Sequence, residues 1–236
     1  MQLPDGKLTT IQARLSPLLA SRVATPTASQ PELPQAFDRL LEVMTRLETD
    51  AGRTDVPGAD VTEIGEYALR LCAALAAELE RTRAGEVRTQ MAELVANVAV
   101  WIARHGGLID SLEPVVDALA LLANAQREPA ALAALSAMIG RIVAAVSPRY
   151  SQDLEKTNPG RPWRVLLINH SIVATRSHDI DLMEAAFALL TRHLPEDAGR
   201  FFSEGMQQMA ALDYPEPVRR LMARYHRQWT QDRSLH

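Results

Sequence analysis

The sequence predicts an all-α protein. Apolar residues recur at helical spacing along most of the 236-residue chain, and glycine, proline or short polar runs separate the periodic segments. Aromatic residues make up only 5% of the chain, so aliphatic residues and alanine must fill the core, which suits close-packed helices. Because the connections are short, consecutive helices are expected to be antiparallel neighbours, about ten in all.

The N-terminal region predicts one helix followed by a linker. The apolar residues at positions 8–19 fit an amphipathic helix, which Pro17 must kink or restart after Ser16. Residues 24–35 are rich in threonine, serine and proline, a composition typical of a loose linker. We therefore assign residues 1–30 to an N-terminal arm or linker.

Residues 31–236 are expected to form a single all-α domain. Their longest polar interruption, residues 149–162, is the only candidate for an internal sub-boundary. Apolar periodicity, N-cap residues and terminal glycines predict helices on both sides of it. These helices lie near residues 37–47, 60–79, 87–105, 112–122 and 129–146, and near residues 163–176, 181–194, 195–209 and 217–229.

Two local features have competing interpretations. The Val-Leu-Leu-Ile run at residues 165–168 fits a buried strand as well as a helix. We expect a helix, because the sequence offers no partner strand elsewhere. Cys72 lies on the apolar face of its helix and is expected to be a small buried residue rather than a reactive thiol.

Two architectures remain open for these helices. Read as hairpins, the units 60–105, 111–147, 163–194 and 195–230 have lengths close to those of tetratricopeptide or HEAT-type repeats. The tetratricopeptide consensus does not recur at a fixed period, so the likeness is one of architecture and not of family. Stacked helical hairpins in an α-solenoid superhelix are the favoured arrangement, and a compact helical bundle is the alternative.

Composition and charge limit the class of protein. The formal net charge of −4 argues against a dedicated nucleic-acid or anionic-membrane binder. The most apolar run, residues 129–146, is interrupted by Arg141 and is too rich in alanine to span a bilayer. A single cysteine cannot form an intramolecular disulfide, and no signal peptide is recognised after Met1. We expect a cytoplasmic protein without cofactor or metal, whose partner is another protein or a second copy of the chain.

Residues suited to recognition concentrate in the C-terminal third. Five of the six histidines, two of the three tryptophans and three of the four phenylalanines follow the Asn158–Pro162 break. The first candidates are Asn169 and Arg176, which fall near the middle of an apolar stripe on their helix. This stripe consists of Val165, Leu166, Ile172 and Val173.

A polar amide and a guanidinium that face a core must find partners. One reading is an internal network with a neighbouring helix end or a capping acid, and this reading is favoured. The other is a pocket near Asn169, His170 and Arg176 that binds a small molecule or a carboxylate, in an enzyme or a binding protein.

Metal and nucleophilic sites have little support. His170 and His178 are eight residues apart, which gives poor metal-ligand spacing on one helix, and capping alone explains Asp179 and Asp181. No GxSxG, Walker or GxGxxG motif is present. We therefore assign no catalytic residue and no metal ligand.

The last predicted helix carries Arg220, Arg224 and Arg227 at positions i, i+4 and i+7. A solvated basic face with a Glu216–Arg220 pair is the simplest interpretation. An acidic protein surface is the better functional alternative, ahead of RNA or DNA. We thus expect a non-enzymatic adaptor that binds another protein through its C-terminal third.

Overall fold

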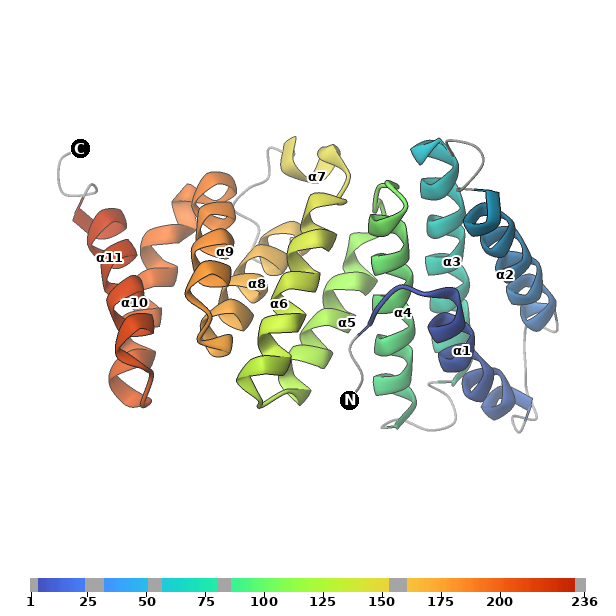
Figure 1. The fold of residues 1–236 in the computed structure, drawn as a ribbon, viewed down its shortest axis with the longest axis horizontal. Helices are drawn as coiled ribbons and strands as arrows, with labels where there is room; N and C mark the ends of the chain where they lie inside the picture. The colour runs from blue at the N-terminus through green and yellow to red at the C-terminus, as the bar shows by residue number, and fades with distance from the viewer. Residues whose placement is uncertain (1–3, 24–31, 51–56, 80–85, 153–160, 232–236) are drawn as a thin grey trace. The chain divides into compact units, whose positions relative to one another are not determined.

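A computed structural model describes residues 4–23, 32–50, 57–79, 86–152 and 161–231 (Figure 1). Within these ranges the regular structure is helical, apart from an isolated bridge between Ile109 and Val146. The helices are α1 (Leu8–Val23), α2 (Leu33–Asp50), α3 (Gly58–Leu79), α4 (Glu86–Arg104), α5 (Leu112–Ala125), α6 (Pro129–Ala144), α7 (Pro148–Gln152), α8 (Pro162–Ser177), α9 (Ile180–His193), α10 (Pro195–Ala211) and α11 (Glu216–Gln231).

The chain divides into two compact units. The first comprises Met1–Ala125 with Arg141–Pro148, and the second comprises Gln126–Gly140 with Arg149–His236. Within the described ranges, no helix combines the length and the hydropathy that a membrane span requires.

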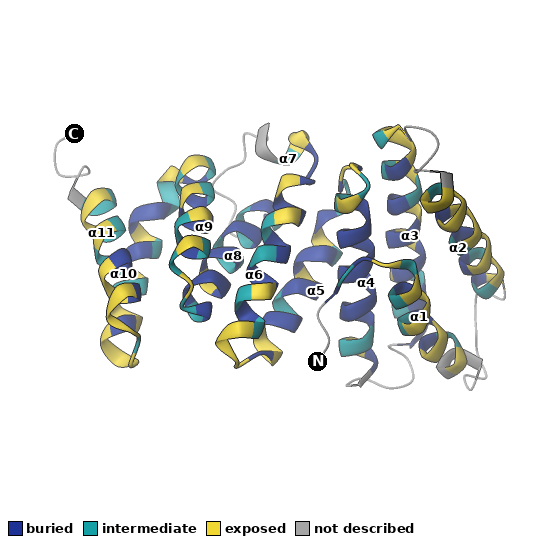
Figure 2. Cartoon of the chain, in the orientation of Figure 1, coloured by how far each residue is buried: buried dark blue, intermediate teal, exposed yellow. Residues whose placement is uncertain are grey.

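Helix α4 is the centre of the first unit. It packs against α1, α3 and α5, while α2 packs against α1 and α3. Figure 2 shows most of α4 buried, and its Trp101 and Ile102 side chains are fully enclosed. The Trp101 indole N–H donates a hydrogen bond to Glu48 Oε1 of α2 over 3.2 Å, so the central helix satisfies its polar atoms through its neighbours.

The second unit is held by an aromatic cluster. Phe187 of α9, Phe201 and Phe202 of α10 and Tyr225 of α11 lie with ring centroids 5.1 to 5.9 Å apart. Most of the ring pairs meet edge to face, the geometry that the aromatic quadrupole favours. The cluster therefore fixes α9, α10 and α11 to one another.

The all-α prediction is confirmed, and residues 165–168 belong to helix α8 as expected. Asp179 caps α9 by accepting a hydrogen bond from the Leu182 backbone N–H over 3.0 Å. Cys72 is buried as expected, and desolvation raises the pKa of its thiol to about 12. The short helix α7 overlaps the start of the polar interruption at residues 149–162, where no helix was predicted.

Pro17 was predicted to kink or restart the first helix, and the restart is wrong because α1 continues through Pro17. Its buried residues on both sides of the proline, Leu15 and Leu18, hold the two halves against the core. Helix α1 falls within the predicted N-terminal arm and packs on α4. The linker expected at residues 24–35 is wrong for residues 33–35, which belong to α2, and residues 24–31 lie outside the described residues.

A buried carboxylate secures the start of α5. Glu66 of α3 accepts hydrogen bonds from the backbone N–H groups of Asp110 and Ser111 over 2.8 and 3.0 Å, and from the Ser111 hydroxyl over 2.5 Å. These donors immediately precede α5, where backbone N–H groups otherwise lack partners. A side chain from another helix thus satisfies the backbone N–H groups that immediately precede α5.

We predict that Glu66→Ala lowers the free energy of unfolding by about 3 kcal/mol, because three donors lose a charged acceptor in a buried place. Urea unfolding followed by circular dichroism measures this loss. Glu63→Ala, on the same helix, serves as the matched control and should cost about 0.5 kcal/mol or less. Equal losses in the two variants would contradict the capping role.

Candidate functional site

The arginine row of α11 lies beside α9 and borders a surface groove of about 420 Å³. Both helices belong to the second unit. The groove is lined by Ile180 and Glu184 from α9, and by Pro217, Arg220, Leu221, Ala223, Arg224 and Arg227 from α11. The structure therefore brings three of the candidate binding residues to one place.

The amphipathic pattern of α11 explains why these arginines share a face. Val218, Leu221 and Met222 are buried and turn the opposite side of the helix toward the unit's core. Residues spaced four and seven apart then lie one above another on the exposed side. Arg220, Arg224 and Arg227 are all exposed there.

The arginines differ in their acidic partners. Arg224 Nη2 lies 2.6 Å from Glu184 Oε1 across the groove, and this hydrogen bond raises the pKa of the guanidinium. Arg220 Nε lies 3.7 Å from Glu216 Oε1, which confirms the expected i,i+4 pair. Arg227 has no acidic partner among the described residues. Of the three lining arginines, Arg220 and Arg224 each have an acidic partner, so the net positive charge among the described residues at the groove comes from Arg227.

The other three candidates, on α8, do not converge. Arg176 Nη2 donates to the backbone carbonyl of Gln126 over 2.6 Å, so it binds the loop that precedes α6. His170 Nε2 lies 3.1 Å from the carbonyl oxygen of Ser136 on α6. Asn169 is half-buried, and its side chain makes no hydrogen bond to another residue in the described ranges.

The apolar stripe predicted for α8 is partly wrong. Ile172 is 42% exposed, whereas the polar Ser171 and Thr175 are buried. The Ser171 hydroxyl donates to the Leu167 carbonyl over 3.0 Å, and the Thr175 hydroxyl donates to the Ser171 carbonyl over 2.8 Å. Because the hydrogen bonds of these hydroxyls are made within their own helix, the two side chains can pack in the core like small apolar groups. The buried face of α8 therefore includes Ser171 and Thr175 and leaves Ile172 exposed.

His170 is a buried neutral imidazole. A carbonyl oxygen can only accept, so Nε2 carries the proton and Nδ1 is left as an acceptor. Nδ1 is buried and has no hydrogen-bond partner in the described part of the chain. Burial lowers the pKa of His170 to about 4, against the opposing effect of the hydrogen bond to Ser136.

His178 and Asp179, two of the residues weighed as metal ligands from their sequence spacing, have structural roles. His178 ends α8 in the left-handed conformation, and its ring meets Tyr214 edge to face at 5.3 Å. Asp179 is the N-cap of α9. Among the described residues, no three His, Cys, Asp or Glu side chains lie close enough together to hold a metal ion.

Sequence reasoning missed Glu184 and a groove in the first unit. Glu184 meets Arg224 across 40 residues of sequence, so no local spacing could have indicated the pair. This groove, of about 620 Å³, lies along α4 between α3 and α5. Small residues on the faces of α3 and α5, such as Ala73, Ala76 and Ala120, were its only sequence signal.

Comparisons of the chain with protein-family models, with curated proteins and with solved structures found no match.

We predict that His170 makes the protein less stable in acid. Its pKa is about 4 when folded, against an ordinary value of 6.5. As the pH falls, the unfolded chain therefore takes up a proton on His170 before the folded chain does. The contribution of the neutral imidazole to the free energy of unfolding is complete above pH 6.5 and is lost as the pH falls toward 4. The loss between about pH 7.5 and about pH 4.5 should be about 2 to 3 kcal/mol.

Urea unfolding of the wild type and of His170→Gln at the two pH values measures this contribution. Glutamine can still donate to the Ser136 carbonyl but does not titrate, so the variant should lose less stability in acid than the wild type. His178→Gln, at the half-exposed end of the same helix, is the control. The same pH dependence in His170→Gln and wild type would refute the assignment.

Proposed function

We propose that this protein is a non-enzymatic interaction module that binds an acidic segment of a partner protein in the groove between α9 and α11. The observation that carries the proposal is the row of exposed guanidinium groups along one edge of the groove. Arginine recognises carboxylates through paired N–H donors, and it is enriched at protein interfaces. Exposed arginines without a full set of acidic partners therefore favour an anionic partner.

The spacing of the arginines along α11 favours a helical partner segment. Arg220 and Arg227 are separated by about 10 Å along the helix axis, at a rise of about 1.5 Å per residue. Carboxylates spaced four and seven residues apart on a partner helix repeat the same separation. Ile180 and Leu221 add apolar contacts beside the arginines, which suits an amphipathic helix with one acidic edge.

A nucleic acid fits less well. Nucleic-acid interfaces are larger and strongly basic, whereas this chain has a net charge of −4 and only three arginines line the groove. The alternative of a small-molecule site near Asn169, His170 and Arg176 also has less support. His170 contacts Ser136 on α6, whereas Arg176 contacts the loop at Gln126. The Asn169 side chain makes no hydrogen bond to either residue.

We predict that replacing Arg220, Arg224 and Arg227 by glutamine weakens binding of an acidic helical peptide about tenfold, because each exposed charge pair contributes only modestly. Fluorescence polarisation of a labelled helical peptide with glutamates at i, i+4 and i+7 measures the affinity. A twin peptide with glutamines and the variant Arg200→Gln, an exposed arginine on α10, are the controls. Equal binding of the two peptides, or tighter binding of an oligonucleotide, would contradict the proposal.

A substitution of Glu184 should change the affinity for the acidic peptide in the opposite direction. Its carboxylate occupies Arg224 in the unbound protein, so an acidic partner must compete with it. We predict that Glu184→Gln raises the affinity for the acidic peptide about threefold. Glu204→Gln, which removes the partner of Arg200 on α10, should leave the affinity unchanged. A loss of affinity in Glu184→Gln would show instead that Glu184 positions Arg224 for binding.

A further inference from the structure

A second groove in the first unit lies between α2 and α3 and has a volume of about 390 Å³. Its apolar lining consists of Leu40 and Val43 from α2 and of Ile64 and Tyr67 from α3. Val43 is 41% exposed and Tyr67 is 40% exposed, so they are two of the five large apolar side chains that the described residues leave in solvent. Exposed apolar side chains that gather in one place are typical of a surface that another molecule covers.

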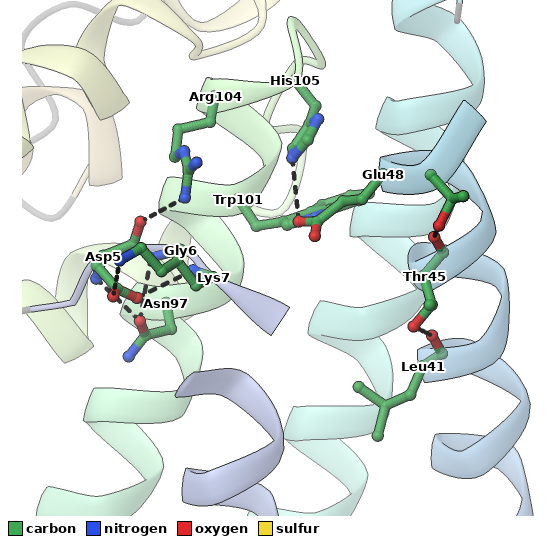
Figure 3. Close-up of polar contacts among 11 residues, drawn as sticks. Asp5, Gly6, Lys7, Leu41, Thr45, Glu48, Asn97, Trp101, Arg104 and His105 are labelled. Atoms are coloured by element: carbon green, nitrogen blue, oxygen red, sulfur yellow. Dashed lines mark hydrogen bonds and ion pairs between the residues drawn. The ribbon is translucent and has the colours of Figure 1, made fainter. Parts of the chain in front are cut away.

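The end of α2 and the start of α3 meet at the same end of α4. Glu48 of α2 accepts a hydrogen bond from the Trp101 indole N–H over 3.2 Å and lies 3.4 Å from His105 Nε2 (Figure 3). At the start of α3, Gly58 lies so close to α4 that a Cβ there would be 2.6 Å from the Gly106 carbonyl oxygen. From this point α2 and α3 run antiparallel (Figure 1), and these contacts hold the two walls of the groove in place.

Charged side chains of opposite sign lie at the two ends of the groove. On α3, Glu63 is five residues beyond Gly58 and Arg70 is twelve residues beyond it. On the antiparallel α2, Arg39 is nine residues before Glu48, so it lies at the same end as Arg70. At a rise of about 1.5 Å per residue, Glu63 and Arg70 are separated by about 10 Å along the helix axis. One end of the groove is thus positive and the other is negative.

None of these three charged side chains forms an ion pair within the described part of the chain. Arg39 Nε donates to the Gln35 backbone carbonyl over 3.3 Å, a hydrogen bond within its own helix. The guanidinium carbon of Arg70 lies 5.8 Å from the centroid of the Tyr67 ring, in a cation–π contact. Tyrosine and arginine are the residue types that often carry most of the binding energy at protein interfaces. The charges around the groove therefore remain available to a second molecule.

A helix of a partner protein complements this surface. α1 packs against both α2 and α3, but neither α1 nor α4 contributes to the lining, so the groove lies outside the contacts between these helices. A helix that lies in the valley between two others presents side chains spaced three, four and seven residues apart. Two turns of it cover the 10 Å or so between the charged ends. Apolar side chains in its middle would then lie on Val43 and Tyr67.

We propose that the groove between α2 and α3 binds an amphipathic helix of a partner protein that carries an acidic and a basic residue two turns apart. The acidic residue pairs with Arg39 and Arg70, and the basic residue pairs with Glu63. The ligand differs from that of the groove between α9 and α11, because it carries both charges rather than acidic residues alone. The site belongs to the first unit and does not rest on the function proposed for the second.

Fluorescence polarisation of the full chain with a labelled helical peptide tests the proposal. The peptide carries glutamate at position i, leucine at i+3 and i+4 and arginine at i+7, and a neutral twin carries glutamine in place of both charges. We expect Tyr67→Ala, and the double variant Arg39→Gln with Arg70→Gln, each to weaken binding of the charged peptide about tenfold. Glu63→Gln should weaken it about threefold. Leu108→Ala, which alters an equally exposed apolar side chain of the same unit, should leave the affinity unchanged.

Three results would overturn the proposal. Equal binding of the two peptides, or an unchanged affinity in the arginine and glutamate variants, would exclude the charge pairing, and these variants alter only exposed side chains. Loss of binding when Arg220, Arg224 and Arg227 are replaced by glutamine would place the peptide in the groove of the second unit. Self-association of the wild type that Tyr67→Ala abolishes, measured by sedimentation velocity, would show that a second copy covers the groove instead of a partner protein.

Discussion

The aromatic contacts of Phe187 are the interaction on which the proposed site depends. The Phe187 ring is fully buried, and its centroid lies 5.1 Å from those of Phe202 and Tyr225. These contacts join α9 to α10 and α11, so they set the distance between Glu184 and Arg224 across the groove. Large aromatic side chains bury much apolar surface with few rotatable bonds, which suits them to holding charged groups at a fixed separation. The arrangement of the charged side chains along the groove thus depends on the aromatic packing beneath them.

Two buried polar side chains in this protein accept hydrogen bonds from backbone groups that lie far away in sequence. Glu66 accepts hydrogen bonds from the two backbone N–H groups just before α5, and Asn97 accepts hydrogen bonds from those of Asp5 and Gly6. In both cases a side chain on one helix satisfies backbone N–H groups of a segment far away in sequence. This requirement follows from the high cost of burying an unpaired backbone group. It also ties the loops and the N-terminal segment to the helical framework.

The helices themselves could be predicted from sequence because apolar periodicity is a local signal. The arginine row on α11 and the Glu216–Arg220 pair could be predicted for the same reason, since both depend on spacing within one helix. The buried face of α8 could not be placed correctly, because a hydropathy pattern does not show that Ser171 is satisfied within its own helix. The contacts of Glu184 and Asn97 cross long stretches of chain, so only the fold could reveal them.

The most direct test of the central claim is to observe the arginine side chains while an acidic helical peptide is added. Nuclear magnetic resonance of the Nε–Hε groups gives one signal for each arginine. The proposed function predicts saturable shifts at Arg220, Arg224 and Arg227, with the largest at Arg224 as it exchanges Glu184 for a carboxylate of the peptide. Shifts confined to other arginines, such as Arg164 or Arg200, would place the acidic partner elsewhere and contradict the account.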